Sequence, residues 1–174
     1  MTKEYEVLKD RCALKAVKFS AFATEETHCY KANLYFDEHL IAEVSNSGHG
    51  GCDRQHVKWG KGWERLVNSL KALKPYEKCK RDDGSSFELR YDVEHVCGDI
   101  MNEWLLNKDI KRVMKKDRIV FLPTGKFNGD LSYFRYNQTD ESRRRIFIRI
   151  HKEHPHAEIL TGRSMDYLRE VWKS

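Results

Sequence analysis

Histidine, cysteine and glycine residues gather in one segment of the chain, residues 46 to 56, whose sequence is NSGHGGCDRQH. Two residues separate His49 from Cys52, and three separate Cys52 from His56. This spacing allows side chains to converge on zinc, which prefers nitrogen and sulfur ligands in tetrahedral geometry. A fourth ligand would come from Cys97, His95, Cys29 or Asp53. No second half of a known zinc module follows, so we expect no cofactor and keep zinc as the alternative.

The same segment allows two further kinds of chemistry. Gly48, Gly50 and Gly51 can turn consecutive backbone amides toward a phosphate or carboxylate, although the segment matches neither the P-loop nor the dinucleotide-binding fingerprint. A nucleophilic cysteine with a histidine base is the other, with candidates Cys29, Cys52, His28, His49 and His56. The favoured interpretation is structural, because glycines serve tight turns that need a positive φ.

Positive charge is concentrated in two places along the chain. The 174 residues hold 32 Lys and Arg against 27 Asp and Glu, a net charge of +5, and this modest total names no partner by itself. Local clusters of this kind either neutralise the phosphates of a nucleic acid or form the solvated face of a helix. The first cluster comprises Lys111, Arg112, Lys115, Lys116 and Arg118, and the second comprises Arg143, Arg144, Arg145 and Arg149.

Cysteine usage and hydropathy argue against secretion and membrane insertion. The five cysteines form an odd set without a disulfide-scaffold spacing, which is typical of free thiols in a reducing compartment. The first ten residues are polar and lack the apolar core of a signal peptide. No apolar run approaches the roughly 20 residues needed to span a bilayer. We therefore expect a cytoplasmic protein without a membrane partner.

Alternating apolar residues predict strands in the first part of the chain. They occur over residues 14 to 22, then at Ala32, Leu34 and Phe36, and again at Ile41 and Val44, which is the period of a strand with one buried face. Only residues 37 to 39 separate the second and third strands, a hairpin length. The first 46 residues thus predict an antiparallel three-stranded meander, followed by a loop over residues 47 to 58.

Helical periodicity dominates the middle of the chain. Residues 63 to 73 place apolar side chains at i, i+3, i+4 and i+7 before Pro75, and residues 92 to 105 keep the same period behind the capping residue Asp92. The polar residues 78 to 86 separate these two predicted helices.

The last part of the chain mixes both patterns. Residues 119 to 122 and 131 to 136 predict two short strands. Residues 139 to 151 are ambiguous, because the isoleucines at 146, 148 and 150 alternate as in a strand while Asp140 and Glu141 resemble a helix start. We favour a helix, since Pro155 ends the segment and its length is unusual for a strand. A strand at 157 to 160 and a helix at 164 to 172 follow.

This order predicts an α+β fold. It comprises the antiparallel three-stranded meander, two helices, a short two-stranded unit and C-terminal helical elements, without the regular strand and helix alternation of a doubly wound sheet. We expect residues 1–174 to form a single domain with a soft sub-boundary near residue 116, because about 60 residues beyond it would be marginal as a separate domain.

Several stretches of the chain carry a family resemblance. ATEET at residues 23 to 27 precedes the second predicted strand, and VSNSGHGG at residues 44 to 51 follows the third. With these stretches, the helix at 104 to 112 and the strand at 118 to 122, the chain resembles a family of uncharacterised small proteins of tailed phages and prophages. The resemblance implies a phage origin and action in the bacterial host cytoplasm, and it implies no established activity.

Three functions remain open, and we favour a non-enzymatic one because no catalytic signature is complete. The leading hypothesis is a phage accessory protein that binds a host protein and inhibits an antiviral defence complex. The alternative is DNA or RNA binding through the basic clusters, and the third is a metal-dependent hydrolase at His49, Cys52 and His56. Trp59 would anchor a partner if exposed. The expected binding residues are Asn46, Gly48, His49, Gly50, Gly51, Trp59, Lys111, Arg112, Lys115, Lys116, Arg143, Arg144 and Arg145.

Overall fold

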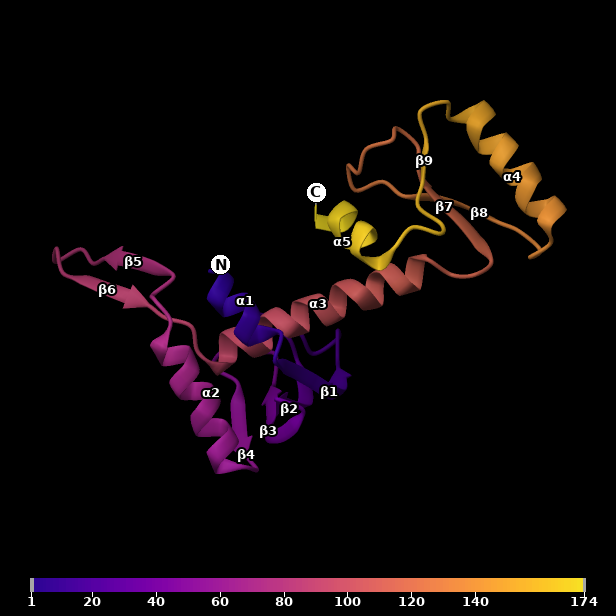
Figure 1. The fold of residues 1–174 in the computed structure, drawn as a ribbon. Coiled ribbons are helices and arrows are strands. Elements are labelled where there is room, and N and C mark those ends of the chain that lie inside the picture. The colour runs from indigo at the N-terminus through magenta and orange to yellow at the C-terminus, as the bar shows by residue number, and fades with distance from the viewer. Residues whose placement is uncertain (1, 174) are drawn as a thin grey trace. The chain divides into compact units, whose positions relative to one another are not determined.

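The computed structural model describes residues 2–173 and has a mixed α+β architecture with antiparallel sheets (Figure 1). The chain divides into two compact units, Met1–Asn102 and Glu103–Ser174. The division falls inside the long helix α3 (Val93–Val113), earlier than the soft boundary that the sequence suggested. The predicted α+β class is therefore confirmed, and each unit is described separately below.

The N-terminal unit contains an antiparallel sheet in the order β1-β2-β3-β4. Its strands are β1 (Cys12–Phe19), β2 (Tyr30–Phe36), β3 (His39–Asn46) and β4 (Arg54–Val57). The predicted meander accounts for the first three, and the fourth lies where a loop was predicted. All four residues of β4 are exposed, so its sequence has no buried alternation. Only the backbone ladder with β3 defines this edge strand.

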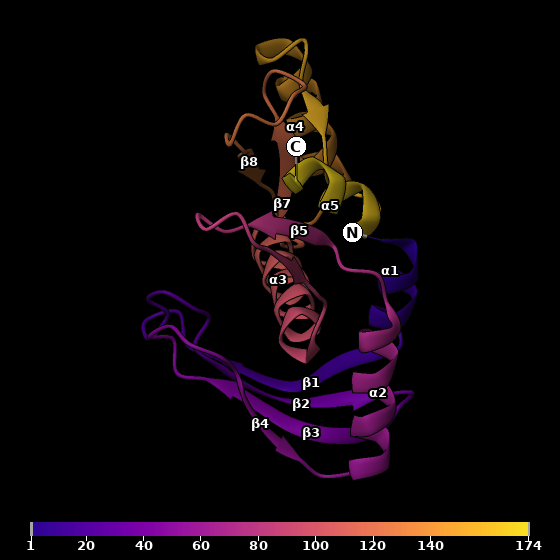
Figure 2. The same cartoon turned by 90° about the vertical axis from the view of Figure 1, so that its left-hand side faces the viewer.

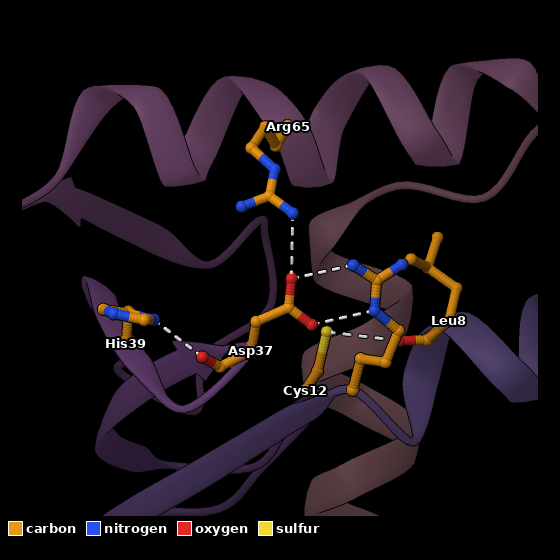
Figure 3. Close-up of polar contacts among 6 residues, drawn as sticks. Leu8, Cys12, Asp37, His39 and Arg65 are labelled. Atoms are coloured by element: carbon orange, nitrogen blue, oxygen red, sulfur yellow. Dashed lines mark hydrogen bonds and ion pairs between the residues drawn. The ribbon is translucent and has the colours of Figure 1, made fainter.

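A two-residue turn joins β2 to β3. Asp37 and Glu38 both have positive φ, 49° and 66°, as a type I′ hairpin turn requires. The Asp37 carboxylate accepts hydrogen bonds from Arg11 Nε at 2.8 Å and Arg11 Nη2 at 2.7 Å, and from Arg65 Nη2 at 3.1 Å (Figure 3). The hydrogen bonding from Arg11 is the main cause that holds the pKa of Asp37 below its usual value. One carboxylate thus ties the turn to β1 and to α2.

Three helices complete the N-terminal unit. They are α1 (Lys3–Lys9), α2 (Gly60–Ala72) and the first turns of α3, which lie over one face of the sheet (Figure 2). The Tyr5 ring of α1 stacks on Tyr91 with centroids 4.0 Å apart, and its hydroxyl donates to Asp99 Oδ2 at 2.7 Å. Leu66 and Leu70 of α2 are buried, which confirms the helical period seen in the sequence. Helix α1 was not predicted.

A separate two-stranded sheet lies between α2 and α3 in the chain. Its strands β5 (Glu77–Lys80) and β6 (Ser86–Leu89) pair antiparallel, in the stretch that the sequence suggested was a polar connection. Most of their side chains are exposed, so the hairpin carries no burial pattern from which it could be recognised.

The C-terminal unit is organised around β7 (Arg118–Leu122), which lies between β8 (Ser132–Arg135) and β9 (Glu158–Ile159). Val120 and Leu122 belong to a buried cluster with Ile110, Leu160 and Leu168. Ile119 and Phe121 belong to a second cluster with Ile150. Because successive residues of a strand point to opposite faces, β7 is buried on both sides.

Helix α4 (Asp140–Glu153) resolves the ambiguous segment in favour of a helix. Its N-cap Thr139 accepts the Ser142 amide through the side-chain oxygen at 3.2 Å. Ile150 is fully buried and Ile146 is half-buried, whereas Ile148 is 69% exposed. This i, i+4 burial is that of a helix face. The terminal helix α5 (Met165–Lys173) lies where it was predicted.

The hydropathy of the helices agrees with the expectation that the sequence holds no membrane span. Within residues 2–173, no helix has both the length and the apolar character that crossing a bilayer demands.

Candidate functional site

Gly48, in the glycine segment, faces the inside of the N-terminal unit. It is buried, and its carbonyl oxygen accepts the backbone amides of Glu25, Glu26 and Thr27 at 3.0, 3.0 and 3.3 Å. Its own amide donates to Asn46 Oδ1 at 2.9 Å. A Cβ at this position would lie 1.9 Å from the carbonyl oxygen of Ala23. Gly48 is therefore required for the packing of two loops.

Asn46 is the centre of the same polar network and is 8% exposed. Its Oδ1 also accepts the Thr27 hydroxyl at 2.7 Å, and its Nδ2 donates to the Gly51 carbonyl and to Asp53 Oδ1, both at 3.1 Å. The Gly50 amide donates to Thr27 Oγ1 at 3.3 Å. The amides of Gly48 and Gly50 thus already have partners within the chain, and the anion cradle is not formed.

Two of the three residues of the proposed zinc triad, His49 and Cys52, have acidic partners, and the third lies on an edge strand. His49 Nδ1 lies 2.9 Å from Glu25 Oε2, and His56 is on β4 opposite Glu43. Hydrogen bonding to Glu94 raises the pKa of Cys52, which disfavours the thiolate that metal binding and nucleophilic attack need. Between residues 2 and 173, no group of three His, Cys, Asp or Glu side chains is arranged to hold a metal ion. The structure gives no support to a zinc site or a metal-dependent hydrolase.

Trp59 is packed against its own unit. Its ring lies 5.1 Å from the ring of His39, and a Cβ at Gly62 would lie 2.2 Å from its Cε3 atom. The residue is half-buried at the start of α2. It therefore supports α2 and does not present a free stacking surface.

A cavity of about 400 Å³ lies beside the glycine segment. Four carboxylates line it, those of Glu25, Glu26, Asp53 and Glu94, and the described lining contains no lysine or arginine. Asp53 accepts the Tyr30 hydroxyl, and its backbone amide donates to Glu94 Oε1 at 3.2 Å. Burial is the main cause that raises the pKa of Tyr30, so this hydroxyl remains a donor. An acidic cavity of this kind repels phosphates.

The C-terminal unit contains a pocket of the opposite charge. It has a volume of about 500 Å³, and no carboxylate is among the described residues that line it. Five cationic side chains line it, those of Lys115, Lys116, Arg118, Arg143 and Arg163. Residues of both basic clusters, which lie far apart in the sequence, therefore meet at one site. We define this site as the basic pocket.

The ends of the strands position the basic pocket. Arg118 begins β7, and the Thr161 hydroxyl, just after β9, donates to its carbonyl oxygen at 3.4 Å. Thr161 Oγ1 also accepts the Val120 amide at 2.7 Å. After β8, the Tyr136 amide donates to the Asp117 carbonyl at 3.0 Å. These bonds fix the turn with Lys115 and Lys116 beside the start of α5.

Most of the charge in the basic pocket is not compensated. Lys115, Lys116 and Arg143 are exposed, and none has a carboxylate partner within the described part of the chain. Arg118 Nε is buried without a hydrogen-bond partner among residues 2–173, and its guanidinium lies 4.2 Å from the centroid of the Tyr133 ring. Arg163 alone has an acidic neighbour, Glu158 at 3.7 Å. The pocket is thus suited to an anion.

The other predicted basic residues lie outside this pocket. Lys111 and Arg112 are exposed in the last turns of α3, where Arg112 pairs with Asp109 at 3.4 Å. Arg144 and Arg145 are exposed on α4, and Arg145 pairs with Glu141. The predicted binding residues that the structure brings together are therefore Lys115, Lys116 and Arg143. Arg118 belonged to the first basic cluster but was not among the expected binding residues. The sequence analysis did not select Arg163, Tyr136 or Thr161, which lie just after strands β9 and β8.

The two units differ in net charge as well. Residues 103 to 174 contain 16 Lys and Arg against 10 Asp and Glu, a net charge of +6, whereas residues 1 to 102 contain 16 against 17, a net charge of −1. The modest total of +5 therefore conceals a C-terminal unit that is strongly basic for its size.

Comparisons with protein-family models, with curated proteins and with solved structures find no match for this chain. The resemblance to phage proteins stays a prediction.

Proposed function

We propose that the chain binds nucleic acid through the basic pocket of its C-terminal unit. The observation that supports this most is the convergence of five cationic side chains on a pocket whose described lining contains no carboxylate. Lysine and arginine side chains bind phosphate oxygens and release counterions when they do so. The net charge of +6 on residues 103 to 174 favours the approach of a polyanion.

The pocket favours a single strand as the nucleic-acid form. Tyr136, Met114 and Met165 line it beside the cations, and unpaired bases pack on aromatic and apolar side chains. In a duplex the bases are stacked on one another, so these apolar side chains would have no base to contact. Phosphates on the cations and a base on the apolar side chains would then occupy different parts of the same pocket.

Salt dependence of binding tests the proposal. Fluorescence anisotropy of a labelled single-stranded oligonucleotide should show affinity that falls with salt, with a slope of log K against log [salt] of roughly −2 for about three neutralised phosphates. The double variant K115A/K116A should flatten this slope. The double variant K111A/K152A removes the same charge outside the pocket and should keep most of the affinity. Undetectable binding, or binding insensitive to salt, would refute the proposal.

Docking on a host defence complex through residues 46 to 51 was the leading hypothesis from the sequence. It required a loop that faces outward. The inward contacts of Asn46 and Gly48 count against such a loop, whereas Ser47, His49 and Gly51 are exposed. Binding of a host protein in the bacterial cytoplasm stays a prediction that derives from the resemblance alone. Co-purification of the chain with lysate of its host would test it separately from the oligonucleotide experiment.

A further inference from the structure

We infer that the basic pocket accepts the phosphorylated end of a strand, a terminal phosphomonoester, in preference to an internal phosphodiester. This inference rests on the proposed function and specifies its ligand. It depends on three features of the pocket, which are the arrangement of its cations, the charge that they leave unpaired, and the helix ends beside them.

The cations of the basic pocket surround a hollow and come from four different segments. Lys115 and Lys116 lie in the turn after α3, Arg118 begins β7, Arg143 is in the first turns of α4, and Arg163 lies between β9 and α5. A protein that follows a strand along its backbone presents cations in a row along a groove. Cations that gather around one hollow instead match one compact anionic group.

The unpaired charge of the pocket exceeds what one internal phosphate can neutralise. A phosphodiester carries a single negative charge, whereas a phosphomonoester carries about −1.5 to −2 at neutral pH and offers three strong acceptor oxygens. Lys115, Lys116 and Arg143 lack carboxylate partners within residues 2–173, and Arg118 Nε is buried without a hydrogen-bond partner there. The additional charge and the third oxygen of the end group would be bound by Lys115, Lys116 and Arg143, which are exposed.

Two helices begin beside the pocket, and the acidic residues of their first turns, Asp140, Glu141 and Asp166, offset part of the positive end of each helix. Met165, which lines the pocket, is the first residue of α5, and Arg143 lies one turn into α4. The N-terminal end of a helix carries a partial positive charge that favours anions, and most of all anions of higher charge. Gly162, with φ of +91°, makes the turn that leads into α5.

The size of the pocket fits the last nucleotide of a strand. A volume of about 500 Å³ is within the range of small-ligand sites, which is roughly 300 to 1,000 Å³. It accommodates an end phosphate together with its sugar and base. The base would pack on Tyr136 and Met165 while the rest of the strand leaves through the open side.

The test uses the full chain and one short single-stranded DNA sequence with an internal fluorophore. The strand is prepared with two hydroxyl ends, with a 5′-phosphate, or with a 3′-phosphate. We expect one of the two phosphorylated strands to bind about tenfold more tightly than the hydroxyl strand, since it gains charge-assisted hydrogen bonds. The two phosphorylated strands distinguish which end the pocket prefers.

Two neighbouring arginines of α4 provide the matched variants. Arg143→Ala removes a cation that lines the pocket, and Arg144→Ala removes an exposed cation outside it. R143A should lose most of the preference for the phosphorylated end, and R144A should retain it. Circular dichroism melting of both variants would verify that the fold is kept.

Each outcome has a separate meaning. Equal affinity for the three strands, with the expected salt dependence, would overturn the inference and leave the proposed function intact. An equal loss of preference in R143A and R144A would mean that the phosphorylated end binds outside the pocket, which would also overturn the inference. Absence of binding to all strands would refute the proposed function and the inference together. A phosphoserine peptide that binds more tightly than the phosphorylated strand would replace the strand end as the ligand.

Discussion

The two units each contain a polar cavity, and the two cavities differ in how their charges are satisfied. In the acidic cavity of the N-terminal unit, Asp53 is bonded to Tyr30 and Asn46, and Glu94 accepts the Asp53 amide. In the basic pocket, Lys115 and Lys116 have no carboxylate partner in the described chain. Buried polar groups that serve the fold are paired within the fold. Exposed cations that converge on one pocket without a carboxylate partner are free to bind an anion.

The largest expected effect is on stability, and it compares a glycine substitution in the N-terminal unit with one in the basic pocket. Gly48→Ala places a methyl group 1.9 Å from the Ala23 carbonyl at a φ of +92°, so we expect a loss of about 3 kcal/mol or more in the free energy of unfolding. Gly162→Ala, in the basic pocket, has φ of +91° but open space around the added Cβ. It should lose only about 1 kcal/mol from backbone strain.

Urea denaturation followed by circular dichroism would measure both glycine variants. Similar losses for the two would contradict the contrast between a packed loop and an open pocket. The Gly48→Ala variant, below its unfolding transition, should still bind a phosphorylated strand.

Charge reversal gives the next largest effect. The double variant K116E/R143E replaces two attractive charges of the basic pocket with repulsive ones, and we expect affinity for a single strand to fall by about 100-fold at low salt. The matched reversal E25K/E26K changes the acidic cavity by the same number of charges and should change affinity by less than about threefold. Anisotropy titrations would measure both. A gain in affinity in E25K/E26K as large as the loss in K116E/R143E would show that overall charge, and not the pocket, determines binding.

A smaller effect is expected at the ionic network of the N-terminal unit. Asp37→Asn removes the carboxylate bonded to Arg11 and Arg65, and should lower the free energy of unfolding by about 1 kcal/mol at neutral pH. Because the pKa of Asp37 is lowered in the folded chain, its stabilisation is present above the usual carboxylate range. It disappears as the pH falls through the lowered pKa.

Denaturation at several pH values would test the sign of this effect. The difference between the parent chain and Asp37→Asn should shrink as the pH falls from 7 toward 2. Lys116→Ala in the basic pocket serves as the contrast, because it removes no ion pair and should not reduce stability at any of these pH values. A difference that grows on acidification would contradict the assigned role of Asp37.

The smallest expected effect concerns the turn between β2 and β3. Glu38 has φ of 66°, which strains a residue with a Cβ. Glu38→Gly should raise the free energy of unfolding by about 0.5 kcal/mol, since the relief of strain is partly offset by the greater entropy of glycine in the unfolded chain. Thermal melting would measure it, and a fall in the melting temperature would contradict it.

The sequence predicted those elements whose burial has a period. The strands of the meander, the two middle helices and α5 bury one face each, and their apolar spacing indicated this. Strand β4 and the β5–β6 hairpin expose nearly all side chains, so backbone hydrogen bonds define them and no residue pattern does. The single domain stays a prediction, and the division into two compact units at Asn102 had no signal in the sequence because it falls inside a continuous helix.

The sequence predicted several residues of the candidate site but not that they come together. Both basic clusters were visible in the sequence, but their meeting depends on β7 pairing with β9 and on α4 beginning beside them. The glycine segment was predicted as a candidate site because histidine, cysteine and glycine are residue types that can bind metals or anions. The geometry shows that Asn46 and Gly48 use their polar groups on one another and on residues 25 to 27, which residue type alone does not reveal.

The single carbonyl of Gly48 that receives three amides has a consequence for how this chain can vary. It joins two loops that lie more than twenty positions apart in the sequence, so an insertion in either loop would shift the donors away from their shared acceptor. Length changes are therefore restricted on that side of the N-terminal unit. Within residues 2–173, the β5–β6 hairpin forms a two-stranded sheet of its own, and it is the natural position for a grafted peptide or an affinity tag.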